Sequence, residues 1–153
     1  MPAPKKVAAW VAVCVACTGA FEGLRTIAYR DPVGIPTFCF GETLHPTGRP
    51  VQLGDTATAN ECKDLLAARV LEFGNGVDRC LTRPARPNQK ASYTSLAYNI
   101  GITGFCKSSI AKKHNAGDDA GACEAILLYD KARGVTLPGL VKRRGEERRI
   151  CLS

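Results

Sequence analysis

The sequence predicts an α+β fold in which a small antiparallel-sheet lobe is joined to a mainly helical C-terminal lobe. Residues 24–56 are rich in proline and glycine with short apolar stretches between them, which is typical of turns and short strands. A helical spacing of apolar residues precedes this region and returns from Thr58 onward. With 153 residues, 45% of them hydrophobic, the chain is long enough to bury a hydrophobic core, so its size alone does not require disulfides or a metal for stability.

Residues 7–23 are predicted to form the first helix. Four large or apolar side chains fall on one face at helical spacing, namely Trp10, Cys14, Cys17 and Phe21. Gly23 favours termination of the helix directly after Glu22. Lys5 and Lys6 precede an uncharged run over residues 7–21, which resembles the basic and apolar regions of an export signal. The run is short and only weakly apolar, so it would hold a membrane weakly.

The later elements follow from the same kind of pattern. A helix is expected from Thr58, with Thr58 or Asn60 as its cap, and Gly74 and Gly76 predict a break or bend in it. Residues 82–88 contain two prolines and are expected to form a connector. Further helices are predicted over residues 88–100, 108–116, 118–129 and 140–151.

The net charge of +7 favours a polyanionic partner, such as nucleic acid, an anionic membrane or a bacterial wall polymer. Seven basic residues crowd between positions 131 and 149, but no aromatic residues interleave with them, which argues against a nucleic-acid surface. We interpret them as a solvated helix face with internal ion pairs, such as Arg144 with Glu147. Arg143, Arg144 and Glu147 are accordingly given structural roles.

The eight cysteines predict disulfides and an oxidising compartment. Only Cys14 and Cys17 form a CxxC pair, and the chain has just two histidines, so no zinc site of the usual spacing is evident. Eight cysteines allow 105 pairings, and their spacing alone does not choose among them.

Two carboxyl groups in contrasting environments suggest acid–base chemistry. Glu22 ends an apolar helix, where partial desolvation disfavours its ionised form and suits a proton donor. Asp31 follows in a polar turn, where an ionised carboxylate is able to activate water. Thr37 lies shortly after and offers a hydroxyl to hold that water. Such a pair is the acid–base pattern of glycosidases.

The surrounding residues resemble the active-site signature of glycoside hydrolase family 24, the phage-type lysozymes. The matching segments are Phe21-Glu22-Gly23-Leu24-Arg25, Ala28-Tyr29-Arg30-Asp31, Gly34-Ile35-Pro36-Thr37 and Gly41. Similar segments continue through residues 58–66, 95–109, 115–118 and 139–151, so the resemblance covers roughly nine-tenths of the chain.

The resemblance implies a lysozyme-like fold with the active-site cleft between the two lobes. It also implies hydrolysis of the β-1,4 bond between N-acetylmuramic acid and N-acetylglucosamine in peptidoglycan. Glu22 would protonate the glycosidic oxygen, while Asp31 would place the attacking water, with inversion, and Thr37 would assist. No metal, other cofactor or nucleic-acid partner is expected, and we expect a monomer.

Three further residues match substrate-contact positions of the family: Tyr98, Ser108 and Thr43. Packing within a helix would explain Tyr98 equally well. The family often has a histidine after the glycine that corresponds to Gly41, whereas this chain has Glu42. We expect Glu42 to point to solvent; if it instead faced Glu22, a third carboxylate would further disfavour ionisation of the acid.

The resemblance also assigns the disulfides, because exported members carry cysteines at positions similar to three pairs here: Cys39–Cys62, Cys80–Cys106 and Cys123–Cys151. Cys14 and Cys17 would remain as buried free thiols. The alternative is a redox switch, in which one of them rearranges a disulfide, for instance at Cys39.

Residues 1–21 are expected to act as an export signal-anchor that associates transiently with the inner membrane through residues 7–21. After release into the periplasm the segment would pack on a catalytic domain formed by residues 22–153. Cleavage after Ala20 is the competing possibility, but it would remove the helix that buries Glu22, so we expect retention.

Two other functions compete with hydrolysis. A lytic transglycosylase cleaves the same bond without water and needs only the acid–base carboxylate, so Asp31 and Thr37 argue against it. A cationic membrane-active protein would account for the net charge and the apolar N-terminus, but it leaves the spacing of Glu22, Asp31 and Thr37 unexplained.

Overall fold

The computed structural model describes residues 8–153 and has the expected α+β architecture. Lys5, Lys6 and residue 7 of the predicted export signal lie outside the described residues. The elements, in chain order, are α1 (Ala9–Glu22), β1 (Arg25–Arg30), β2 (Pro36–Cys39), α2 (Ala59–Cys80), α3 (Pro87–Ile100), α4 (Ile102–Cys106), α5 (Ser109–Asn115), α6 (Asp119–Ala125), a short 3-10 helix (Ile126–Leu128), β3 (Lys131–Ala132), β4 (Val135–Thr136) and α7 (Pro138–Leu152).

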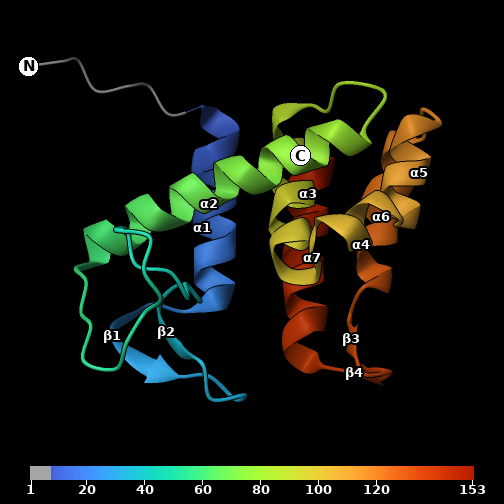
Figure 1. Cartoon of the computed structure of the whole chain (residues 1–153). Helices are drawn as coiled ribbons and strands as arrows, with labels where there is room; N and C mark the ends of the chain where they lie inside the picture. The colour runs from blue at the N-terminus through green and yellow to red at the C-terminus, as the bar shows by residue number, and fades with distance from the viewer. Residues whose placement is uncertain (1–7) are drawn as a thin grey trace, which may run out of the picture.

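The sheet lobe is built on the antiparallel pair β1–β2, which lies below α1 and α2 in Figure 1. Asp31 closes the connection between the two strands, because its Oδ1 accepts hydrogen bonds from the backbone N–H groups of Val33 (2.9 Å) and Ile35 (2.8 Å). Tyr29 pairs with Thr37 across the strands. Thr37 therefore lies near the start of β2, directly after the turn that begins at Asp31.

Helix α2 crosses from the sheet lobe to the helical lobe without a break (Figure 1). It begins with a capping box, in which the Thr58 hydroxyl accepts from the Glu61 N–H and the Glu61 carboxylate accepts from the Thr58 N–H. The predicted break at Gly74 and Gly76 is wrong. Both glycines lie inside the helix and are buried, and their missing side chains make room for neighbouring side chains from other segments.

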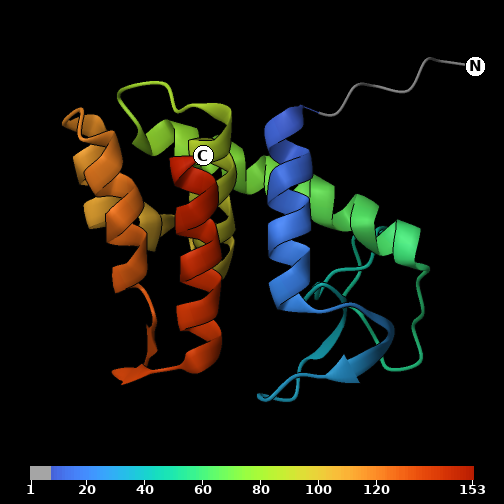
Figure 2. The ribbon, with the colours of Figure 1, turned by 180° about the vertical axis from the view of Figure 1, so that it is seen from behind.

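Helix α1 packs against α2 and α3 and runs alongside α7 on the face seen in Figure 2. Cys14 and Cys17 of the predicted stripe are buried, whereas Trp10 and Phe21 are half-buried against the same core, and Val11 joins the buried residues. Trp10 lies over Gly74 of α2, and the ammonium of Lys90 lies 4.3 Å from the centre of its ring. No helix within residues 8–153 is both long and apolar enough to cross a membrane.

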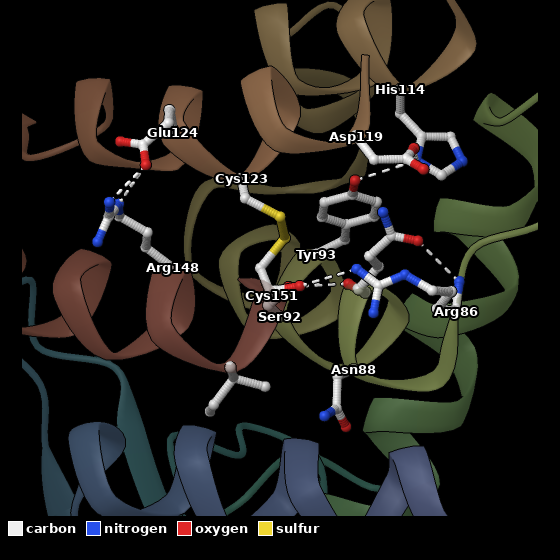
Figure 3. Close-up of a disulfide and its surroundings, with 12 residues drawn as sticks. Arg86, Asn88, Ser92, Tyr93, His114, Asp119, Cys123, Glu124, Arg148 and Cys151 are labelled. Carbon is white, nitrogen blue, oxygen red and sulfur yellow. Dashed lines mark hydrogen bonds and ion pairs between the residues drawn. A yellow bond between two sulfur atoms is a disulfide. The ribbon is translucent and has the colours of Figure 1, made fainter. Parts of the chain in front are cut away.

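The helical lobe is joined by the Cys123–Cys151 disulfide, which connects α6 to α7 (Figure 3). Beside it, the Arg86 guanidinium donates to the Cys151 carbonyl at 3.2 Å and so ties the start of α3 to the end of α7. The hydroxyl of Tyr93 lies 3.0 Å from Nδ1 of the fully buried His114. These contacts fix α3, α5, α6 and α7 as one packed unit.

The three disulfides are the pairs that the resemblance implied: Cys39–Cys62, Cys80–Cys106 and Cys123–Cys151. Cys14 and Cys17 are free and buried. Their sulfur atoms each lie 3.6 Å from a hydroxyl, that of Thr18 for Cys14 and that of Ser95 for Cys17. Burial raises the pKa of Cys14 to about 12 and also raises the pKa of Cys17, so in this conformation both are neutral thiols of low reactivity.

Candidate active site

Glu22 is the last residue of α1, and Gly23 ends the helix with a φ of 76°. This backbone conformation suits glycine and turns the chain directly into the sheet lobe, so the carboxylate projects where the two lobes meet. The side chain is 24% exposed. A pocket of about 380 Å³ opens beside it and is lined by Phe21, Glu22, Asn99, Leu137, Gly139, Leu140 and Arg143.

Arg143 holds the Glu22 carboxylate from α7. Its Nη1 donates to Glu22 Oε1 at 2.7 Å, while its Nη2 donates to the Ser95 carbonyl of α3 at 2.9 Å. The guanidinium is 4% exposed, and its Nε lies 3.3 Å from the carboxylate of Glu147. Arg143 is therefore more than the structural residue predicted, because it contacts the candidate acid itself. The contact leaves Glu22 Oε2 free of protein hydrogen bonds within residues 8–153.

Asp31 and Thr37 both lie on the β1–β2 hairpin of the sheet lobe. Both N–H bonds to Asp31 end on Oδ1, which leaves Oδ2 available to a ligand. Thr37 is buried at 4% exposure, and its hydroxyl donates to the Ile35 carbonyl at 2.9 Å. The hydroxyl oxygen therefore keeps its acceptor lone pairs, and hydrogen bonds within the hairpin orient both side chains.

The turn that follows β2 contributes a wall of backbone facing Glu22. Gly41 has a φ of 89°, and a Cβ at this position would lie 4.0 Å from Glu22 Oε2. The next side chain, Glu42, is only 6% exposed, so the prediction that it points to solvent is wrong. It is turned inward by two partners from distant helices, Arg69 of α2 and Tyr98 of α3.

Comparison with known proteins decides the family. The profile of the phage lysozyme family matches residues 19–147, which include the whole site described above. This chain belongs to the phage lysozyme family. It is a glycoside hydrolase by membership, and the resemblance seen in its sequence is confirmed.

Relatives of this phage lysozyme match along most of their length. The SAR-endolysin of Enterobacteria phage P21 is 35% identical over 131 residues, which cover 86% of this chain and 77% of the relative. An endolysin from Escherichia coli O157:H7 phage FAHEc1 has a similar structure, with a TM-score of 0.85 and 32% identity, covering 100% of this chain and 97% of that one. A mutant of P22 lysozyme also gives a TM-score of 0.85, at 31% identity, covering 92% of this chain and 95% of that one.

The three predicted substrate-contact residues of the phage lysozyme lie in different surroundings. Thr43 is exposed and lines a second pocket, of about 240 Å³, with Glu42 and Arg69 among its other lining residues. Tyr98 is half-buried, and its hydroxyl donates to the Phe40 carbonyl at 3.1 Å. Ser108 is 3% exposed and caps α5, because its hydroxyl accepts from the Ala111 N–H at 3.2 Å and donates to the Phe105 carbonyl at 2.6 Å. The structure thus gives Ser108 a capping role.

A buried charge network lies behind Arg143. Glu147 is fully buried, accepts a 2.6 Å hydrogen bond from the Ser95 hydroxyl and pairs with both Arg143 and Arg144. The predicted pair of Arg144 with Glu147 is confirmed, and Arg144 also bonds the Asn99 side chain beside the pocket. The two guanidiniums and the Ser95 hydroxyl offset part of the free-energy cost of burying the Glu147 charge. The network therefore holds α3 and α7 rigidly against Glu22.

Arg143 is the contact of the candidate acid that the sequence did not reveal. It lies 121 residues from Glu22 along the chain and within a basic cluster that looks like ordinary helix surface. Its only local signal is the pairing distance to Glu147, four residues on. Within residues 8–153, no group of three or more His, Cys, Asp or Glu side chains is arranged to hold a metal ion.

Proposed function

We propose that this phage lysozyme is an endolysin that hydrolyses the β-1,4 bond between N-acetylmuramic acid and N-acetylglucosamine in peptidoglycan and so lyses the bacterial host. The observation that carries the proposal is the placement of the Glu22 carboxylate at the lobe junction, held through one oxygen by Arg143. The other oxygen faces Gly41 and is free to carry the proton that an acid must donate.

The proposed reaction assigns each proton and bond. Glu22 gives its proton to the glycosidic oxygen as the bond to the anomeric carbon breaks. A water oxygen attacks that carbon from the opposite face, with Asp31 accepting the proton of the water and Thr37 helping to hold it. The free Oδ2 of Asp31 and the acceptor lone pairs of Thr37 support these roles. The product sugar would have the inverted anomeric configuration.

Substitution of the acid tests this function. Glu22→Gln should remove nearly all clearing of purified cell walls, because an amide cannot donate the proton. Glu124→Gln is the matched control, since Glu124 forms an exposed pair with Arg148 between α6 and α7 (Figure 3) and does not line the pocket beside Glu22. Clearing by Glu22→Gln at the rate of the control would contradict the assignment of Glu22 as the catalytic acid and favour a membrane-active protein.

We propose that residues 7–21 first serve as a signal-anchor in the inner membrane and that, after release into the periplasm, this part of the chain supplies most of α1 (Ala9–Glu22). The SAR-endolysin name of the relatives supports this route. So does the packing of α1, because release from the membrane lets Val11, Cys14 and Cys17 bury in the core. That burial contributes about 25 cal/mol for each Å² of apolar surface.

The docked helix offers a clean test of the membrane step. Ala12 and Ala16 are exposed on α1, so leucine at both positions adds apolar surface without entering the core. Ala12→Leu with Ala16→Leu should shift the protein toward the membrane fraction and lower activity in the soluble fraction. The control is Ala120→Leu, an exposed alanine of α6. An unaltered wild type found trimmed at Ala20 and fully active would show that the helix is a disposable signal.

A further inference from the structure

The turn from Phe38 to Glu42 forms the part of the site wall that faces Glu22. It is closed by two backbone hydrogen bonds between its end residues, Phe38 N–H to Glu42 O at 3.0 Å and Glu42 N–H to Phe38 O at 2.9 Å. Gly41, inside the turn, is the residue that approaches Glu22 Oε2. Any movement of this turn therefore changes the surroundings of the oxygen that would carry the catalytic proton.

The side chain of Glu42 connects this turn to two helices. Tyr98 of α3 donates its hydroxyl to the Phe40 carbonyl at 3.1 Å and lies 3.3 Å from Glu42 Oε1. Arg69 of α2 places its Nε 3.6 Å from Glu42 Oε2. The ring of Phe73 packs between these partners, 5.1 Å from the Tyr98 ring and 5.4 Å from the Arg69 guanidinium carbon. The turn, α2 and α3 thus meet at one carboxylate.

Protein stability alone does not favour a carboxylate here. Burial raises the pKa of Glu42, and the nearby Arg69 charge offsets only part of that effect. The Nε of Arg69 is itself buried and makes no hydrogen bond. Charged groups that cost stability in this way are typical of positions where function constrains the residue.

We infer that Glu42 is a positioning residue for catalysis, whose ionised carboxylate holds the end of the Phe38–Glu42 turn, beyond the Cys39–Cys62 disulfide, to α2 through Arg69 and to α3 through Tyr98, and so fixes Gly41 against Glu22. The inference rests on the proposed function, in which Glu22 is the acid. Glu42 does not touch the substrate bond. It acts through the backbone next to the acid, where displacements of about 1 Å are enough to lower rates substantially.

This arrangement makes the position of the turn depend on pH. Protonation of Glu42 removes its attraction to Arg69, so the end of the turn keeps the hydrogen bonds of Tyr98 alone, while the Cys39–Cys62 disulfide still ties the start of the turn to α2. The titratable and charged groups around Glu42 are Arg69 and Glu72 on α2, Tyr98 on α3, Glu22 on α1, and His45 on the loop of the adjoining pocket. Burial, with the charges of Glu42 and Glu22, raises the pKa of Tyr98, so its hydroxyl stays neutral and keeps donating throughout.

The test is Glu42→Gln, which keeps an acceptor for Tyr98 but removes the charge that attracts Arg69. We expect kcat on soluble peptidoglycan fragments at pH 7 to fall about tenfold with KM nearly unchanged. This is less than the loss of about 100-fold that a 1 Å displacement of catalytic groups is able to cause. The acid limb of the kcat profile should move to lower pH, because one group that must be ionised is gone. Unfolding in urea should show equal or higher stability than wild type.

Two further variants make the result specific. Arg69→Met should lower kcat to a similar extent, and the double variant with Glu42→Gln should be no worse than either single one, because both remove the same contact. Asp64→Asn is the matched control, since this exposed carboxylate lies on α2 but does not line the pocket of Glu42 and Arg69, and it should keep wild-type kcat.

An unshifted acid limb in Glu42→Gln with wild-type kcat would overturn the inference. A loss of activity that merely follows a loss of stability would overturn it too, because that is the behaviour of a structural residue. Failure of the proposed function looks different: the wild-type protein itself would then release no new reducing ends from peptidoglycan.

Discussion

The contact of Trp10 with Gly74 allows a direct test of how α1 is docked. A methyl group added at Gly74 would lie 3.0 Å from Cζ3 and 3.2 Å from Cζ2 of the Trp10 ring, with Cη2 closer still. Distances this short require Trp10 or α2 to shift. Gly74→Ala therefore perturbs the docking of α1 without changing the sequence of α1 itself.

Two opposing effects set the size of the change. Alanine in place of glycine stabilises a helix interior by about 1 kcal/mol. Overpacking a buried contact costs about 1–3 kcal/mol. Gly145→Ala isolates the first effect, because Gly145 is exposed in the middle of α7 and a Cβ there meets nothing within 4 Å. Gly74→Ala should therefore be less stable than Gly145→Ala by about 1–3 kcal/mol.

Urea unfolding followed by circular dichroism measures this difference. In a Trp10→Ala background the clash is absent, so Gly74→Ala should become as stabilising as Gly145→Ala. If Gly74→Ala and Gly145→Ala stabilise the wild-type protein equally, Trp10 does not rest on α2, and the described docking of α1 is refuted.

Two more predictions concern the stability of the fold. Replacement of Cys123 and Cys151 together by serine should lower the free energy of unfolding by about 3–4 kcal/mol, since the bond closes a loop with a sequence separation of 28; an unchanged urea midpoint would contradict this. Because burial raises the pKa of Glu42, the folded state holds that proton more tightly than the unfolded chain, so the charged form costs stability at neutral pH and the cost disappears as pH falls through the raised pKa. The stability of Glu42→Gln relative to wild type should therefore be greatest near pH 7 and shrink toward pH 4.5. An increase of this difference on acidification would contradict the prediction.

Local patterns predicted most of the helices because their causes lie within a few residues. The capping box at Thr58 and the apolar stripe of α1 are examples. The predicted break in α2 failed because Gly74 and Gly76 make room for Trp10 and for Ile102, which come from other parts of the chain. Glycine weakens a helix locally, but tertiary packing decides the outcome. Helix α4 and the β3–β4 hairpin are too short to give a periodic signal, and neither was predicted.

The candidate site was likewise predicted from the sequence only in part. Glu22, Asp31 and Thr37 were recognised from their spacing within one short segment, and their catalytic roles remain predictions. The inward orientation of Glu42 was missed because it depends on Arg69 and Tyr98 from two later helices. No spacing rule connects such residues, so only the folded structure brings them together.

The product formed in ¹⁸O-labelled water tests the central claim most directly. If Glu22 donates the proton and Asp31 places water, each cleaved bond should give an N-acetylmuramic acid reducing end that carries one ¹⁸O at the anomeric carbon, with the α configuration formed first. An anhydro sugar without the label would contradict the claim, because the bond would then break without water. A labelled product formed first as the β anomer would equally contradict it, since that outcome requires a retaining path.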